Sequence, residues 1–175
     1  QRSFTAKMPS GKIVSVISTR FNSLVKNKIG AIAYQVTPVN FSGEAKITPS
    51  VDFDVVNSDS NYDEKFWVEQ EKKASEGFSY VMASTKKTDF RVATGMEFHI
   101  GGSFGSAGKT TNEREKYVEV TETGSVKEGE AFTVYKYAAN ISSMYFDKDQ
   151  LVTVCADEIS KALAIGFDDL LDEHK

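Results

Sequence analysis

The chain has 175 residues and a mass of 19.3 kDa, a length that suits one globular domain with a sizeable core. Hydrophobic residues make up 40% and charged residues 26%, which is the balance of an ordinary globular domain rather than of a disordered or membrane segment. The net charge is −4, with 21 basic residues interspersed among 25 acidic ones, so the composition argues against nucleic-acid binding.

Alternation of apolar and polar residues dominates the chain and predicts antiparallel β-structure. Glycine, proline and serine mark turns between the alternating runs, and their spacing favours a sandwich of hairpins over a parallel sheet. The predicted strands cover residues 4–8, 13–24, 31–38, 45–53, 79–85, 90–100, 117–126 and 131–142.

Helical character is confined to two segments. Residues 63–74 are predicted to form a short helix that begins with a capping box at Ser60 and ends at Gly77. Residues 149–163 place apolar side chains at helical spacing, and a further turn reaches Leu171. We expect this second helix to follow the last strand of the sandwich.

Cys155 is the only cysteine of the chain, which excludes an internal disulfide and fits a reducing compartment. We expect its side chain to be a small buried apolar group. No run approaches the ~18 consecutive apolar residues of a membrane span. Because the chain begins with Gln1 rather than methionine, we expect it to be a fragment of a longer polypeptide.

The segment at residues 102–110, GSFGSAGKT, looks like a phosphate-binding P-loop, in which a glycine-rich turn precedes a helix. Its spacing differs, because five residues separate Gly102 from Gly108 and the residues that follow lead toward a strand. We predict a flexible hairpin loop without nucleotide binding.

Residues 59–63 place oxygen ligands at alternate positions, as a calcium-binding loop does. Glu64 stands at the sixth position, where such loops need glycine, and Gln70 at the twelfth, where they need glutamate. A capped, hydrogen-bonded loop is the better interpretation. His99 and His174 are the only histidines and are too far apart in sequence to indicate a metal site or a catalytic dyad, so we predict a structural role for His99.

Residues 38–67, PVNFSGEAKITPSVDFDVVNSDSNYDEKFW, run from a strand into an acidic, asparagine-rich loop that ends in paired aromatic residues. This segment resembles the N-terminal domain of glycoside hydrolase family 65, which comprises maltose, trehalose and kojibiose phosphorylases, and the likeness is greatest to the maltose phosphorylases. Similar matches flank it at residues 18–21, 29–32, 86–93 and 164–171.

The resemblance implies a mainly β, antiparallel super-sandwich of the galactose mutarotase-like type over residues 1–148. Residues 149–175 would then be a helical linker toward an (α/α)6 catalytic barrel that the chain does not contain. The domain of this family begins upstream of the present first residue, so we expect strands to be missing and sheet edges to be unpaired.

The same resemblance implies that the parent enzyme is a cytoplasmic dimer that performs inverting phosphorolysis, converting maltose and phosphate into β-glucose 1-phosphate and glucose. Its general acid would lie in the barrel. We therefore expect this chain to hold no catalytic residue, cofactor or metal, and to support the barrel, the rim of its pocket or the dimer. Its partners would be its own barrel, a second copy, and the disaccharide and phosphate bound by the parent.

A polar loop tipped with aromatic side chains has the composition of an interface. Asp52 and Asp54 could form a pair of carboxylates on one strand face, although strand-end aspartates more often accept backbone hydrogen bonds. Trp67 could stack on a sugar ring, although a buried structural tryptophan is the more common case. The candidate rim or interface residues are Asp52, Asp54, Asn57, Asp59, Asn61, Tyr62, Phe66 and Trp67.

Two other functions stay open at this point. A free-standing carbohydrate-binding module with the same sandwich fold would bind oligosaccharide without a catalytic partner. A mutarotase-like enzyme would need a pair of histidines and a carboxylate on the concave face of the sandwich, and the histidine content weakens that alternative.

Overall fold

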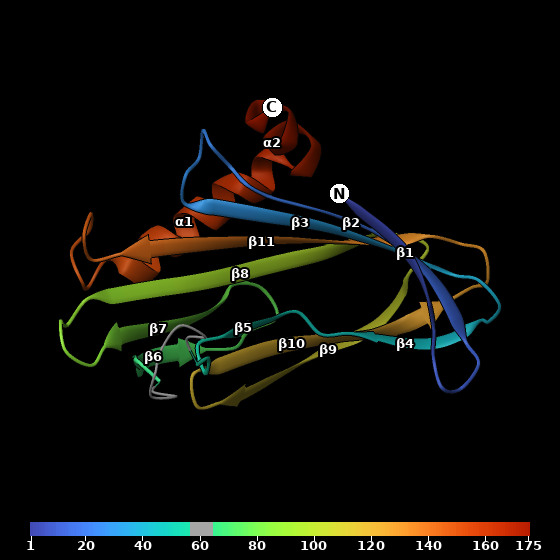
Figure 1. The fold of residues 1–175 in the computed structure, drawn as a ribbon, viewed down its shortest axis with the longest axis horizontal. Coiled ribbons are helices and arrows are strands. Elements are labelled where there is room, and N and C mark those ends of the chain that lie inside the picture. The colour runs from blue at the N-terminus through green and yellow to red at the C-terminus, as the bar shows by residue number, and fades with distance from the viewer. Residues whose placement is uncertain (57–64) are drawn as a thin grey trace.

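The computed structural model describes residues 1–56 and 65–175. Eleven strands and two helices lie in these two ranges (Figure 1). The elements are β1 (Arg2–Lys7), β2 (Ile13–Asn22), β3 (Ile29–Pro38), β4 (Gly43–Ile47), β5 (Ser50–Asp52), β6 (Trp67–Lys73), β7 (Ser79–Thr85), β8 (Arg91–Gly102), β9 (Gly105–Arg114), β10 (Tyr117–Val126), β11 (Phe132–Ser142), α1 (Leu151–Ile165) and α2 (Phe167–His174).

The strands form two antiparallel sheets. The larger sheet has seven strands in the order β1-β2-β3-β11-β8-β7-β6. In the smaller sheet, β10 pairs with β4 and β5 and also with β9. Figure 1 shows the sheets as two layers, with α1 and α2 on the outer side of the larger one. The predicted antiparallel sandwich with a C-terminal helix is confirmed.

Two hydrophobic cores hold the three layers together, and β11 contributes to both. Phe132 and Val134 are buried between the sheets, whereas Tyr137, Ala139 and Ile141 are buried beneath the helices. Side chains alternate between the two faces of a strand, so a strand in the middle layer needs apolar residues at both sets of positions.

The strands predicted from alternation are present, with one subdivision. The predicted strand over residues 45–53 is divided into β4 and β5 by Thr48 and Pro49. Proline has no backbone N–H to donate to a neighbouring strand, so it interrupts the ladder along β10. Both pieces still pair with the same strand, Ile47 with Glu122 and Ser50 with Glu119.

The helix predicted over residues 63–74 is wrong. The described part of this segment forms β6, which pairs antiparallel with β7 at an edge of the larger sheet. Its sequence, WVEQEKK, is rich in helix-forming residues, but pairing with a buried strand outweighs that weak local preference. The proposed capping residue Ser60 lies outside the described residues.

The flexible loop predicted over residues 102–110 is also wrong beyond its first residues. Gly105–Arg114 forms β9, which pairs with β10 along almost its whole length. The turn that precedes β9 needs glycine, because Gly102 has a φ of +86° and an added Cβ would lie 2.8 Å from the carbonyl oxygen of Ala131.

The helical prediction at the C-terminus is confirmed. Gly166, with a φ of +88°, separates α1 from α2. Leu151, Cys155 and Ile159 lie on the face of α1 that packs on the larger sheet, and all three are fully buried. Burial raises the pKa of the Cys155 thiol to about 12, which fits its predicted role as a small apolar group. Within the described ranges, neither helix is long and apolar enough to cross a membrane.

Candidate functional site

The candidate residues of the sequence analysis lie around the connection between β5 and β6. The structure describes Asp52, Asp54, Phe66 and Trp67 on the two sides of this connection. Residues 52–54 and 65–67 are called the stem below. The other four candidates, Asn57, Asp59, Asn61 and Tyr62, lie outside the described residues.

Two lysines converge on Asp54. The Nζ atom of Lys65 donates to Oδ1 of Asp54 at 2.7 Å, and the Nζ atom of Lys116 lies 3.4 Å from the same oxygen. The hydrogen bond from Lys65 holds the pKa of the Asp54 carboxyl below its ordinary value, with a further contribution from Lys116. Asp54 is therefore ionised at neutral pH and fixed between two cations.

Asp52 has a different set of partners. Its Oδ1 atom accepts a hydrogen bond from the backbone N–H of Asp54 at 2.7 Å, and its Oδ2 atom lies 3.4 Å from Nη2 of Arg114. The two aspartates thus share no cation, since Asp52 pairs with Arg114 and Asp54 with Lys65 and Lys116. A proton shared between adjacent carboxylates raises one pKa, whereas here the pKa of Asp54 is lowered. The pair has the contacts of a structural turn rather than of an acid/base dyad.

The aromatic residues fasten the stem to the core between the sheets. The ring of Trp67 meets the ring of Phe53 edge-on, with centroids 5.2 Å apart and planes at 83°, and lies 6.4 Å from the ring of Phe90. Trp67 is half-buried and packs on the inter-sheet core. The carbonyl oxygen of Phe66 accepts a hydrogen bond from the backbone N–H of Lys86 at 3.1 Å. These contacts favour the structural interpretation of Trp67 over a sugar-stacking one.

The turn between β9 and β10 supplies the second anchor of the stem. Lys116 occupies this turn with a φ of 57°, an uncommon conformation for a residue with a side chain. Its backbone N–H donates to Oε2 of Glu69 at 2.5 Å, while its own carbonyl oxygen accepts from the backbone N–H of Phe53 at 2.8 Å. One residue therefore links the turn to Phe53 of the stem and to β6, the strand that follows the stem.

Sequence analysis missed the residues that neutralise and anchor the stem, namely Lys65, Glu69, Arg114 and Lys116. Lys65 is close to the candidates in sequence and could have been included as the counter-charge of an acidic loop. Arg114 and Lys116 are brought to the stem by the pairing of β10 with β5 and β9, and Glu69 contacts the backbone of Lys116. The chain's local pattern does not specify these contacts.

His99 lies on β8, and its ring is stacked on Tyr135 with centroids 5.0 Å apart. Partial burial lowers its pKa, and the charge of Lys109 lowers it further. These contacts agree with the structural role predicted for His99. Among the residues that the structure describes, no group of three His, Cys, Asp or Glu side chains could hold a metal ion.

Comparison with known proteins assigns the whole chain to one family. The sequence model described as "Glycosyl hydrolase family 65, N-terminal domain" matches residues 1–175. The chain belongs to glycosyl hydrolase family 65. The resemblance found in the segment at residues 38–67 thus extends over the full length of the chain.

Relatives of this family 65 domain are disaccharide phosphorylases. It is 26% identical over 184 aligned residues to the alpha,alpha-trehalose phosphorylase of Thermoanaerobacter brockii, covering 100% of the domain and 24% of that enzyme. It is 27% identical over 168 residues to the maltose phosphorylase of Bacillus subtilis (strain 168). That alignment covers 93% of the domain and 21% of the maltose phosphorylase.

A solved structure with the same fold is described as a kojibiose phosphorylase from the human microbiome. It matches 99% of the family 65 domain and 22% of its own chain, with a TM-score of 0.84 and 13% sequence identity. The domain therefore spans about a quarter or less of the length of these relatives. Because the sequence identity is only 13%, this comparison shows a shared fold and nothing about the substrate.

Proposed function

We propose that the chain is the non-catalytic N-terminal β-sandwich domain of an inverting disaccharide phosphorylase. The observation that supports the proposal most strongly is the family match over residues 1–175, together with relatives whose names are those of trehalose and maltose phosphorylases. Those relatives are roughly four times longer than the chain, which leaves room for a catalytic domain.

In the proposed parent enzyme, phosphate attacks the anomeric carbon of an α-glucoside while a carboxylic acid protonates the departing sugar. We assign that acid to an (α/α)6 barrel. The stem supports this assignment, because Asp54 is ionised and ion-paired and therefore unsuited to donating a proton at neutral pH. Maltose is the substrate that we propose, with β-glucose 1-phosphate and glucose as products, in a cytoplasmic enzyme.

In this proposal, residues 1–148 form the sandwich domain and residues 149–175 form the connection toward the barrel. The buried face of α1 anchors this connection to the larger sheet. The stem and the loop between its two sides are the proposed contact with the barrel, the pocket rim or a second copy of the enzyme. The ion pairs of Asp54 and the packing of Trp67 fix the ends of that loop in place.

The first test is the mass of the native polypeptide, measured with an antibody raised against the chain. A band several times heavier than 19.3 kDa is the expected result. A band near that mass would contradict the proposal and favour the free-standing carbohydrate-binding module, for which oligosaccharide binding by the chain itself is the next measurement.

The second test separates the domain from the active site. The purified chain is incubated with phosphate and with maltose, trehalose or kojibiose in turn, and released glucose is measured. We expect no phosphate-dependent release from any of the three. Release by the chain alone would show that it holds catalytic residues and would overturn the proposed role.

A further inference from the structure

Three neighbouring strands of the larger sheet place two cations in one row. Arg20 of β2 pairs with Ile32 of β3, and Ile32 pairs with Lys136 of β11. Side chains of paired residues lie on the same face of a sheet, and adjacent strands are ~4.8 Å apart, so the α-carbons of Arg20 and Lys136 are about 10 Å apart. Lys136 reaches Ser50 of the smaller sheet, so both cations lie on the face between the sheets.

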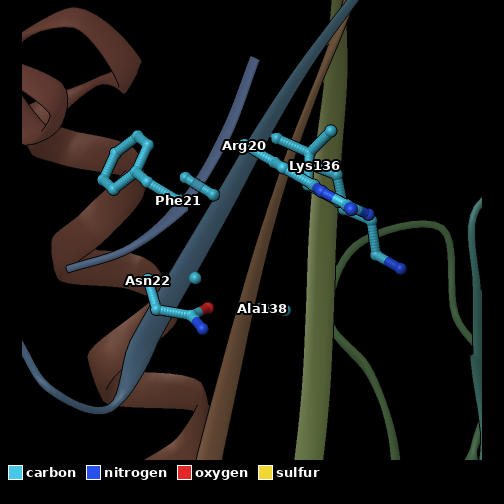
Figure 2. Close-up of a pocket in the computed structure, with 8 residues that line it drawn as sticks. Arg20, Phe21, Asn22, Lys136 and Ala138 are labelled. Carbon is cyan, nitrogen blue, oxygen red and sulfur yellow. The ribbon is translucent and has the colours of Figure 1, made fainter. Parts of the chain in front are cut away.

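The next row leaves a hollow beside these cations. It consists of Asn22, Gly30 and Ala138, whose side chains are short or absent. The hollow has a volume of about 330 Å³. Figure 2 shows Arg20, Lys136 and Asn22 around it, with the Asn22 amide directed over the strand that carries Gly30. A Cβ at Gly30 would lie 2.9 Å from Oδ1 of Asn22, so the absence of a side chain there allows the amide its position.

The lining of this cavity contains Arg20 and Lys136 but no carboxylate from the described residues. Several other lysines of the described ranges differ, since Lys26, Lys65 and Lys72 each lie within 3 Å of an acidic oxygen. For Lys136 the structure gives one hydrogen bond, from Nζ to the carbonyl oxygen of Ser50 at 2.6 Å, although an ammonium group has three N–H donors.

Burial lowers the pKa of Lys136, and no neighbouring anion of the described residues opposes that shift. A second hollow, of about 570 Å³, adjoins the first through Arg20 and adds Arg2 to the cations along this face. In a chain with a net charge of −4, this face brings together Arg2, Arg20 and Lys136, and no carboxylate of the described residues lines either hollow. An anion placed among these side chains would relieve both the desolvation of Lys136 and the repulsion between the cations.

We propose that the cavity bounded by Arg20, Asn22 and Lys136 is a binding site for a small oxyanion of the phosphate type. The guanidinium of Arg20 presents paired N–H donors that match the oxygens of a tetrahedral anion. Lys136, whose side chain lies beside that of Arg20 in Figure 2, supplies a second charge, and the Asn22 amide supplies a neutral donor. The site consists only of residues of this chain. Whether it binds phosphate can therefore be tested independently of the proposed phosphorylase function.

The experiment uses the ¹⁵N-labelled chain, titrated with sodium phosphate against sodium chloride at equal ionic strength. The expected result is a saturable shift of the amide signals of Asn22, Gly30 and Ala138. The substitutions Arg20→Gln and Lys136→Gln should each weaken binding about tenfold, since each removes one charged donor. Lys127→Gln is the control for the loss of one positive charge, because that side chain is 74% exposed and does not line the cavity.

Thermal melting of each variant separates loss of binding from loss of the fold. Arg20 is exposed, so Arg20→Gln keeps the core intact and decides the test even where Lys136→Gln unfolds. A further variant, Gly30→Ala, should also weaken phosphate binding because its methyl group displaces the Asn22 amide.

Two results would overturn the proposal. Shifts that do not saturate, or that Arg20→Gln leaves unchanged, would mean that phosphate associates with the surface only as an adventitious ion. Acetate at equal ionic strength tests the other source of oxyanion chemistry, a carboxylate. Binding of acetate as tight as that of phosphate would assign the cavity to a carboxylate group instead.

Discussion

Asp54 and Lys65 are joined by a 2.7 Å ion pair although eleven positions separate them in the chain. The pair closes the stem at the base of the candidate loop. Lys116 approaches the same carboxylate at 3.4 Å from the turn between β9 and β10. The two sides of the stem are therefore fixed to each other and to the turn between β9 and β10.

The charge of Asp54 should make stability depend on acidic pH. Its pKa is lowered from an ordinary value of 3.8 by the hydrogen bond from Lys65, so the folded state favours the ionised form. This contribution is present above pH 3.8 and is lost as the pH falls through the lowered pKa of the folded state. Asp54→Asn should therefore weaken the acid dependence of the unfolding free energy below pH 4, measured by urea denaturation across that range.

The matched control for this prediction is Asp157→Asn, which alters an exposed carboxylate on α1. Its acid dependence should follow that of the unmodified chain. If Asp54→Asn also follows the unmodified chain, the ion pairs of the stem contribute nothing measurable in solution.

Truncation of Trp67 tests the attachment of the stem to the core. Trp67→Ala removes the edge-on contact with Phe53 and the contact with Phe90. Because the side chain is only half-buried, we expect a loss of about 2 kcal/mol in unfolding free energy, below the range for a fully buried tryptophan. Denaturant titration followed by circular dichroism measures it, and Tyr145→Ala, at a residue that is 79% exposed, should change it little.

The sequence predicted the sandwich because most of its strands have one or two apolar faces. β11 shows this clearly, since Phe132 and Val134 on one face and Ala139 and Ile141 on the other alternate with polar or partly exposed residues. β6 and β9 lack such a pattern and are strands through pairing with β7 and β10. Their conformation depends on the strand with which each forms a hairpin, and local propensity does not contain that pairing.

The same distinction explains what was predictable at the candidate site. The acidic, aromatic composition of residues 38–67 drew attention to Asp52, Asp54 and Trp67, which the structure places in the stem. Its anchoring by Arg114 and Lys116 depends on the register of β9 and β10, which brings those side chains to the end of β5. The cavity beside Arg20 and Lys136 depends on register as well, through the pairing of β2 and β11 with β3.

Gly95 marks a position where the larger sheet and α1 approach closely. A Cβ at this residue would lie 2.3 Å from the ring of Phe78 and 2.8 Å from Sγ of Cys155. Gly95→Ala should therefore destabilise the domain by about 1–3 kcal/mol through overpacking. It should also speed the modification of Cys155 by a thiol reagent, because the buried thiol, with its pKa raised to about 12, reacts only when the helix moves away.

Gly77→Ala is the control for that substitution, since the nearest atom to an added Cβ there is Oε1 of Glu97 at 3.8 Å. It should leave both stability and the labelling rate of Cys155 close to those of the unmodified chain. Equal labelling rates in the two variants would mean that α1 adjusts to the added methyl group without loosening.

Tyr80 gives a prediction at the alkaline end. Burial, together with the hydrogen bond from its hydroxyl group to Glu71, raises its pKa from an ordinary value of 10.0 to about 12. The folded state therefore keeps the proton that the unfolded chain releases near pH 10, so stability should fall as the pH rises from 10 to about 12. Absorbance of the phenolate follows the titration directly.

The variant Tyr80→Phe removes the hydroxyl group, so its unfolding free energy should fall less steeply over the same pH range. If the two chains lose stability with the same slope, Tyr80 ionises as freely in the folded chain as in the unfolded chain.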